Sequence, residues 1–288
     1  MNEEAMPLER EPDIRDLIAR ALAEDVGTGD ATTLALVEAD ARATARIAAR
    51  HELVVAGGAV AAEVFRMVDG SVEAECLAAD GETARAGSAV MRVEGPARAL
   101  LTAERTALNL FQRMSGIATA TECLVRIVTD YGTQILDTRK TVPGLRRLDK
   151  YAVKCGGGTN HRIGLHDAVL IKDNHLAFWR RKNKGMLADA VRAARVARPG
   201  MKIEIEVDTL EQLAEALPGE PDWVLLDNMA PETAARAVAM CGGRCKTEAS
   251  GGITKDNVRE YARAGVTAIS IGALTHSVRA ADLGMDFD

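Results

Sequence analysis

The chain has 288 residues, which is enough for one large α/β domain or two smaller ones. Apolar residues at 47% and charged residues at 27% are typical of a globular protein, whereas an aromatic content of 3% argues against a base-stacking nucleic-acid surface. The net charge of −6 argues against a general binder of nucleic acid or anionic membranes, and no apolar run reaches the roughly 18 residues of a membrane span. The acidic start "MNEEAMPLEREPD" lacks the pattern of a secretory signal.

The five cysteines are odd in number and show no C-x-x-C spacing. This usage predicts reduced thiols and a cytoplasmic location. Cys241 and Cys245 are close in sequence, but no histidine lies near them, so we do not expect a metal site there.

The first third of the chain mixes helices and strands. Residues 13–27 carry apolar side chains at helical spacing, with Asp13 as the expected N-cap. Residues 43–58 alternate like a strand, and residues 74–95 are predicted to form short strands joined by a turn. Two helices follow, separated near Ser115–Gly116. We therefore predict one domain over residues 1–115 and a second over residues 116–288.

From residue 133 onward, short β-branched runs alternate with amphipathic helices. The expected strands are residues 133–140, 167–175, 202–209, 222–228, 245–252 and 268–273. The last four recur about every 20 to 23 residues, which is typical of βα units. We expect a parallel βα barrel, with an open doubly wound sheet as the alternative because the period alone does not show closure.

Each expected strand ends in polar or small residues. These are Asp137 to Lys140, Lys172 to His175, Glu204 with Glu206 and Asp208, Asp227 with Asn228, Glu248 with Ser250 to Gly252, and Gly272 with Ala273. In a βα barrel these ends share one face, on which active sites are built. The pattern therefore predicts a binding or catalytic face.

The most basic part of the chain is "LDTRKTVPGLRRLDKYAVKCGGGTNHR", residues 136–162. Arg139, Lys140, His161 and Arg162, together with Lys172, predict a wall that binds a multiply anionic ligand. For the cations of residues 146–154 we expect a solvated helical face instead. Glycines 156–158 do not follow the dinucleotide-binding pattern, so we expect them to shape a loop that presents His161 and Arg162.

Acidic and small residues complete the face. Alternation in "KIEIEVD" puts Glu204 and Glu206 on the side opposite the aliphatic residues. With Asp227 they suggest recognition of sugar hydroxyls and a Mg²⁺ beside phosphate oxygens; the alternative is ion pairing to Lys140 or Lys172 without a metal. The small residues of 250–252 and 271–273 let backbone amides approach a phosphate.

Seven segments together resemble one known family. They are "EDVGTGDATT", "LTAERTALNLFQRMSGIAT", the long motif from Leu136 to His175, "IEIEVD", "DWVLLDN", "EASGGI" and "ISIGALTHS". In order, from about residue 14 to the end, they resemble quinolinate phosphoribosyltransferase, the carboxylating nicotinate-nucleotide pyrophosphorylase. The resemblance implies an N-terminal α/β sandwich followed by an incomplete, seven-stranded parallel βα barrel, and a homodimer or higher multiple. It also implies that quinolinate and phosphoribosyl pyrophosphate are converted, with Mg²⁺, into nicotinate mononucleotide, pyrophosphate and CO₂ for NAD synthesis.

The same resemblance implies roles for single residues. Arg139, His161, Arg162 and Lys172, with Thr138 beside them, are expected to hold quinolinate, and Arg105 to reach it from the neighbouring subunit. Lys140, Glu206 and Asp227 are the expected catalytic residues, of which Glu206 and Asp227 contact the ribose and hold Mg²⁺, directly or indirectly. The 5-phosphate is expected at Ser250, Gly251, Gly252, Gly272 and Ala273, near His276.

One segment departs from the family pattern. After "KDNH" the chain carries a basic stretch around residues 178–184, about five residues longer than the family's usual link. It is either a lid or subunit contact, or a loop of solvated charge. Two other functions stay open at this point: a related phosphoribosyltransferase with another acceptor, as found with molybdate-transport genes, and a non-catalytic sensor of a phosphorylated metabolite.

Overall fold

The computed structural model describes residues 6–183 and 185–288. These residues form two compact units that are not continuous in sequence. The first contains the described residues up to 120, with residues 143–157 and 278–288, and the second contains residues 121–142 and 158–277. The domain boundary near residue 115 stays a prediction, but segments from far along the chain return to the first unit.

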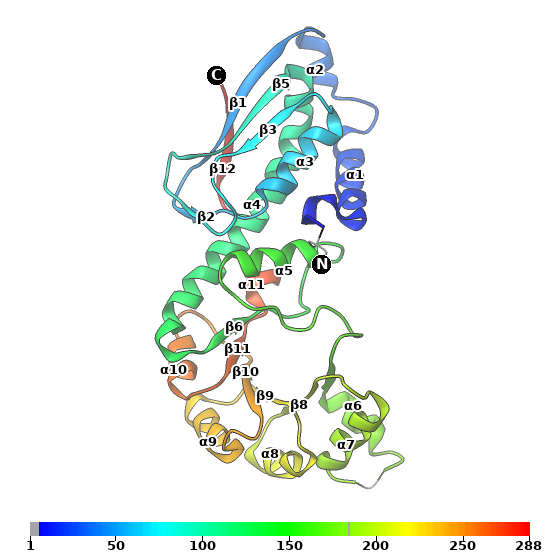
Figure 1. Cartoon of the computed structure of the whole chain (residues 1–288), viewed down its shortest axis with the longest axis vertical. Coiled ribbons are helices and arrows are strands. Elements are labelled where there is room, and N and C mark those ends of the chain that lie inside the picture. The colour runs from blue at the N-terminus through cyan, green and yellow to red at the C-terminus, as the bar shows by residue number, and fades with distance from the viewer. Residues whose placement is uncertain (1–5, 184) are drawn as a thin grey trace, which may run out of the picture. The chain divides into compact units, whose positions relative to one another are not determined.

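The first unit is built on an antiparallel sheet in the order β12-β1-β5-β3. Its elements are η1 (Leu8–Arg10), α1 (Pro12–Val26), α2 (Ala31–Leu36), β1 (Arg42–Ala49), β2 (Leu53–Val54), α3 (Gly58–Val68), β3 (Glu73–Cys76), β4 (Thr83–Ala84), β5 (Ala89–Pro96), the larger part of α4 (Ala97–Val128), α5 (Arg146–Cys155) and β12 (Leu283–Phe287). Alternate residues of β1, namely Ala45, Ile47 and Ala49, are fully buried, so one face of the sheet joins the core. In Figure 1, β12 from the end of the chain lies beside β1 from its beginning.

Two local predictions in this unit are wrong. The predicted break at Ser115–Gly116 is absent, because α4 runs without interruption from Ala97 to Val128. A Cβ atom at Gly116 would lie 2.3 Å from the backbone oxygen of Arg279, so this glycine allows close packing and does not end a helix. Asp13 is not the N-cap of α1, since that position belongs to Glu11 and Asp13 lies in the first turn.

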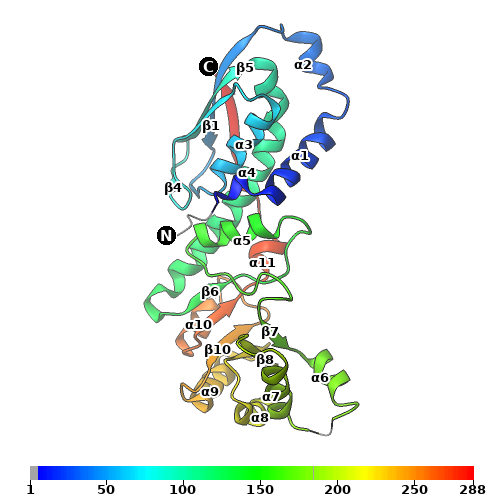
Figure 2. The same cartoon turned by 45° about the vertical axis from the view of Figure 1, so that its right-hand side comes forward.

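The second unit is a parallel sheet in the order β6-β11-β10-β9-β8-β7. Its elements are the end of α4, η2 (Thr129–Tyr131), β6 (Gln134–Leu136), β7 (Val169–Ile171), α6 (Asp173–Trp179), α7 (Leu187–Ala197), β8 (Ile203–Val207), α8 (Leu210–Ala216), η3 (Leu217–Gly219), β9 (Trp223–Asp227), α9 (Pro231–Cys241), β10 (Lys246–Ser250), α10 (Val258–Arg263), β11 (Ala268–Ser270) and α11 (Ala273–His276). Helices α7 to α10 lie along the outer side of the curved sheet (Figures 1 and 2). The predicted succession of βα units is confirmed.

The sheet of the second unit is an incomplete barrel with β6 and β7 at its two edges. Six strands form the sheet, and a seventh position is occupied only by Thr159, which makes an isolated parallel bridge to Leu136. Its amide donates to the carbonyl of Ile135 at 2.8 Å. The segment after the glycine run therefore lies along β6, and this brings residues 160–162 to the interior of the barrel.

Side-chain alternation along β8 matches the prediction. Ile203, Ile205 and Val207 are buried and β8 packs against α7 and α8, while Glu204 and Glu206 point to the other side, into the barrel. No helix among residues 6–183 and 185–288 combines the length and the apolar character of a membrane span.

Candidate active site

A cavity of about 520 Å³ opens at the carboxyl ends of the parallel strands. Its walls are polar and combine both signs of charge. It is lined by Thr138, Arg139, Lys140, His161, Arg162, Leu170, Lys172, Glu206, Leu225, Asp227, Asn228, Glu248, Ser250, Gly251, Gly252 and Ser270. A larger hollow of about 800 Å³ beside α6 and α7 has mostly aliphatic walls and no carboxylate among its lining residues. We therefore assign the chemistry to the smaller, charged cavity.

Two guanidinium groups, those of Arg139 and Arg162, lie near one another in the wall. The Nε atom of Arg139 is buried and has no hydrogen-bond partner within the described part of the chain. Burial, and then the charge of Arg139, lower the pKa of the Arg162 guanidinium. A buried donor without an acceptor and two adjacent cations are both unfavourable in an empty pocket. This part of the cavity is therefore suited to an anion with more than one negative charge.

Carboxylates follow on the neighbouring strands. Glu206 is held by Lys172, whose Nζ lies 2.5 Å from Oε2, and Lys172 is also the N-cap residue of α6. Asp227 accepts a hydrogen bond from the side-chain amide of Asn228 at 2.7 Å. Glu206 and Asp227 lie near the carboxyl ends of adjacent strands and both line the cavity, so they form one acidic side of it.

Small residues leave space at the ends of β10 and β11. Gly251 has a φ of +97°, and a Cβ atom there would lie 2.1 Å from Oδ1 of Asn228, so only glycine fits this turn. Gly272 lies beside Lys140 and His276, since a Cβ atom at this position would be 2.9 Å from the side chain of Lys140 and 3.1 Å from that of His276. The backbone of Lys140 is fixed there, because its carbonyl accepts a hydrogen bond from the Thr275 hydroxyl at 2.7 Å.

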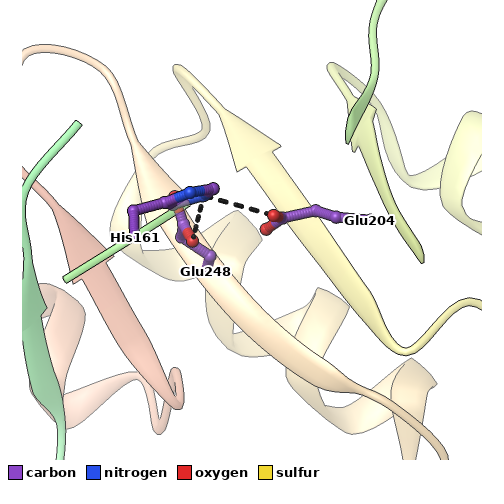
Figure 3. A group of neighbouring side chains, drawn as sticks. All are labelled: His161, Glu204 and Glu248. Carbon is purple, nitrogen blue, oxygen red and sulfur yellow. Dashed lines mark ion pairs between the residues drawn. The ribbon is translucent and has the colours of Figure 1, made fainter. Parts of the chain in front are cut away.

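In the wall of the cavity, His161 points between two buried glutamates (Figure 3). Its Nε2 atom is 3.2 Å from Glu204 and 3.3 Å from Glu248, which come from β8 and β10 and have no exposed surface. Nδ1 accepts the backbone N–H of Arg162 at 2.7 Å. We call His161, Glu204 and Glu248 the buried trio.

The three groups of the buried trio shift one another's pKa values. Burial acts to lower the pKa of His161, but the two carboxylates outweigh burial and raise it to about 9. Burial raises the pKa of Glu248, whereas at Glu204 the contact with His161 outweighs burial and lowers the pKa. The amide at Nδ1 favours a neutral ring and the carboxylates favour a charged one; in both forms Nε2 carries the proton that faces the glutamates.

Comparison with known proteins identifies the family. The sequence profile described as quinolinate phosphoribosyl transferase, N-terminal domain, matches residues 30–115, and that of the C-terminal domain matches residues 117–286. The chain belongs to the quinolinate phosphoribosyltransferase family.

Individual relatives agree with this assignment. A nicotinate-nucleotide pyrophosphorylase [carboxylating] of Mycobacterium leprae is 46% identical, covering 94% of this chain and 96% of its own. A probable enzyme of the same name from Bacillus subtilis is 42% identical, covering 95% and 93%. The solved nicotinate-nucleotide pyrophosphorylase of Francisella tularensis superposes with a TM-score of 0.90 at 39% identity, covering 97% of this chain and 98% of the other.

The positions of the residues expected from the quinolinate phosphoribosyltransferase resemblance can now be compared with the cavity. Thr138, Arg139, Lys140, His161, Arg162, Lys172, Glu206, Asp227, Ser250, Gly251 and Gly252 all line it. Gly272 and His276 are next to Lys140 without lining the cavity, and Ala273 follows Gly272 at the start of α11. Arg105 is in the first unit, on α4, with an exposed guanidinium 4.0 Å from Glu104. Their roles in binding remain proposals.

Some residues of the cavity had no individual role in the predicted site. Glu248 lines the cavity and Glu204 lies behind it, and both were predicted on the face of the strand ends without a role of their own. Ser270, which also lines the cavity, was not predicted. Glu248 and Ser250 are two residues apart on β10, so both point to the same side of the sheet.

The positive charge of the basic segment around residues 178–184 is compensated in part by residues of the second unit. Arg180 lies 3.5 Å from Glu215, and the guanidinium of Arg181 stacks 4.4 Å from the ring centre of Phe178. Residue 184 lies outside the described residues.

The acidic side of the cavity fits a magnesium ion in its chemistry. Glu206 and Asp227 supply the hard oxygen atoms that Mg²⁺ binds. The ammonium group of Lys172 already lies 2.5 Å from Glu206, so Asp227 is the better direct ligand and Glu206 is suited to contact through water. The ion pairing of Glu206 with Lys172 that the sequence offered as the alternative is thus present as well.

Proposed function

We propose that the 520 Å³ cavity is the site at which this chain joins quinolinate to the phosphoribosyl group of phosphoribosyl pyrophosphate, with loss of CO₂. As a member of its family, the chain is a phosphoribosyltransferase of NAD biosynthesis. The observation that carries the proposal for this cavity is the buried Nε of partly buried Arg139, which stands beside Arg162 and has no partner among the described residues, because a dianionic acceptor supplies what these groups lack.

The acceptor occupies the basic side of the cavity. Arg139, Arg162 and Lys172 hold the two carboxylates of quinolinate, with Thr138 beside them and His161 in the same wall. Holding both carboxylates fixes the ring and directs its nitrogen at the anomeric carbon of the sugar. This positioning contributes to the rate because the attack needs a defined line of approach.

The sugar occupies the acidic side. Glu206 and Asp227 contact the ribose, and their negative charge stabilises the positive charge that develops at the anomeric carbon as pyrophosphate leaves. The 5-phosphate lies at the open turn of Ser250, Gly251 and Gly252, with Gly272, Ala273 and His276 beyond it. Lys140, fixed by Thr275 between these two parts, offsets the charge of the departing pyrophosphate.

Proton transfer is not needed for the attack, because the lone pair of the ring nitrogen is free. After transfer the positive charge on the ring nitrogen stabilises the electron pair that stays on the adjacent ring carbon when its carboxylate leaves as CO₂, and that carbon then takes up a proton from water. We further propose that Asp227, and Glu206 through water, hold a Mg²⁺ ion. When bound, this ion supplies additional positive charge for the pyrophosphate.

The assembly and location are also proposals. A homodimer or higher multiple would let Arg105 of one chain reach the cavity of another, and the exposure of 59% of its side chain with only a distant contact to Glu104 supports this role. A cytoplasmic location rests on the cysteine usage of the sequence, and quinolinate and phosphoribosyl pyrophosphate, not nucleic acid or membrane, are the expected partners.

One assay tests the reaction. The purified protein with phosphoribosyl pyrophosphate, Mg²⁺ and carboxyl-labelled quinolinate is expected to release labelled CO₂ and pyrophosphate in equal amounts. Nicotinate, which has only one carboxylate, is the matched acceptor control and is expected to react poorly. Pyrophosphate release that requires another acceptor in place of quinolinate would favour the alternative of a different acceptor, and no release with quinolinate would contradict the proposed reaction.

Mixed subunits test the shared site. Arg105→Ala and Lys140→Ala chains are each expected to be nearly inactive alone, and activity is expected to return when the two are mixed and reassembled. If mixed dimers, verified by differential tags, recover no activity, donation of Arg105 across an interface is wrong.

A further inference from the structure

The buried trio is not explained by the proposed reaction. Two carboxyl groups with no exposed surface, Glu204 and Glu248, face the interior of the barrel, where a leucine or valine would ordinarily fill the space. None of their four oxygens accepts an aligned hydrogen bond within the described residues. Burying two carboxylates is unfavourable unless a cation or a hydrogen-bond donor lies beside them.

That contact is His161, and it uses every polar atom of the ring. Nε2 faces both glutamates at 3.2 Å and 3.3 Å, and Nδ1 accepts the amide of Arg162 at 2.7 Å. The backbone N–H of His161 donates to Oδ1 of buried Asp137 at 2.9 Å. With both ring nitrogens engaged by the protein, His161 has no polar atom left to offer to a ligand in this arrangement.

The next residue in this chain of contacts is Arg162. Its amide is fixed by the imidazole, and its Nη1 donates to the carbonyl of Ala168 at 3.3 Å, beside β7. Its guanidinium faces the repulsion of Arg139, which would displace it from the wall if the backbone were free to move.

We propose that Glu204 and Glu248 are positioning residues, which hold the imidazole of His161 so that His161 in turn fixes Arg162 against Arg139 for the acceptor. The trio thereby compensates for the absence of a complete strand between β6 and β7, where only Thr159 is bridged to the sheet. This inference rests on the proposed function, and it changes the role of His161 from a direct contact with quinolinate to a support of Arg162.

The trio also has the composition of a metal site, since its ligand atoms lie within 4.8 Å of one another. We favour positioning, because Nε2 already stands between the two carboxylates and the amide at Nδ1 fixes the ring in that orientation. A metal at the trio would displace this proton from Nε2.

A double-mutant cycle with His161 tests the proposal. Glu248→Gln keeps the shape of the side chain and removes its charge; we expect the KM for quinolinate to rise about tenfold, with the KM for phosphoribosyl pyrophosphate and kcat changed less than about twofold. In a His161→Asn background the same substitution is expected to change the quinolinate KM less than about twofold, because the path to Arg162 is already broken. Glu204→Gln is expected to behave in the same way.

The controls separate positioning from loss of structure. Glu63→Gln, at a glutamate of the first unit that is 9% exposed and 3.5 Å from Arg15, is the matched control and is expected to leave both KM values unchanged. Thermal unfolding of every variant shows whether it is folded, and calorimetric binding of quinolinate to folded protein replaces kinetics where activity is too low.

Three outcomes overturn the inference. They are equal losses for both substrates, additive effects of Glu248→Gln and His161→Asn, and a metal ion at one per chain that is lost in Glu248→Gln. An inactive wild-type protein would instead contradict the proposed function, so the two failures are distinguishable.

Discussion

The two ends of the basic stretch 136–162 and its middle look alike in sequence, but the structure gives them different surroundings. Arg139 and Arg162 belong to the second unit and stand near each other in the cavity wall. The middle forms α5 in the first unit, where Arg147 pairs with Glu11 and Asp13, and Asp149 receives two hydrogen bonds from Arg113. Arg147 is paired with carboxylates, whereas Nε of Arg139 is buried without a hydrogen-bond partner among the described residues, and Arg162 donates to a neutral carbonyl, that of Ala168.

The prediction of a helix for residues 146–154 is confirmed, and the prediction that its cations are exposed holds for Lys154 but is wrong for Lys150. An exposed face was expected for residues 146–154, yet Lys150 is 1% exposed. Positive charge in the sequence therefore indicates a ligand most clearly at Arg139, whose buried Nε has no hydrogen-bond partner among the described residues. Four substitutions test this distinction, beginning with the largest expected effect.

Removing the buried carboxylate of α5 should unfold the protein without altering its chemistry. Asp149→Ala leaves Arg113 without the acceptor of two 2.8 Å hydrogen bonds, so we expect a loss of about 3–5 kcal/mol in the free energy of unfolding. Urea denaturation measures this loss. The quinolinate KM of the folded fraction should stay near that of the wild type, and a selective rise in it would show that α5 serves the cavity directly.

Removing Arg139 should have the opposite effect, with a loss of quinolinate binding and no loss of stability. Arg139→Ala is expected to weaken quinolinate binding about 100-fold, since a charge-assisted contact to a carboxylate is lost, while stability is kept or improved because repulsion of Arg162 disappears. Calorimetry of quinolinate binding and thermal unfolding give the two quantities. Unchanged affinity would contradict the clamp.

The acidic side should be separable from the basic side. Asp227→Asn removes one negative charge next to Asn228, and we expect the KM for phosphoribosyl pyrophosphate to rise about tenfold, with a smaller change for quinolinate. Steady-state kinetics with each substrate varied in turn decides this. Equal losses for both would show that the two sides do not divide the substrates between them.

Removing the surface residue Arg147, which is paired with carboxylates, should have the smallest effect on stability and on both KM values. Arg147 contacts Glu11 and Asp13 with a side chain that is 40% exposed, so Arg147→Ala should cost at most about 1 kcal/mol of stability. Both KM values should be unchanged, which makes this variant the natural control for Arg139→Ala. A large kinetic effect would place α5 among the binding elements after all.

Part of the fold could be predicted from periodicity alone. The βα units after residue 133 and the inward direction of Glu204 and Glu206 follow from local patterns, and the structure confirms both. The uninterrupted α4 could not be predicted, because the reason for Gly116 is a segment more than 160 residues later in the chain. The return of β12 to the first unit was missed for the same reason.

The sequence by itself determined which residue types meet at the ends of the strands, because parallel strands put their carboxyl ends on one side, and it carried motifs specific enough to identify the family. Only the tertiary structure decided which charges find partners. Pairing depends on distances between side chains from different elements. These distances pair Arg147 with Asp13, leave Nε of Arg139 without an acceptor among the described residues, and enclose His161 between Glu204 and Glu248.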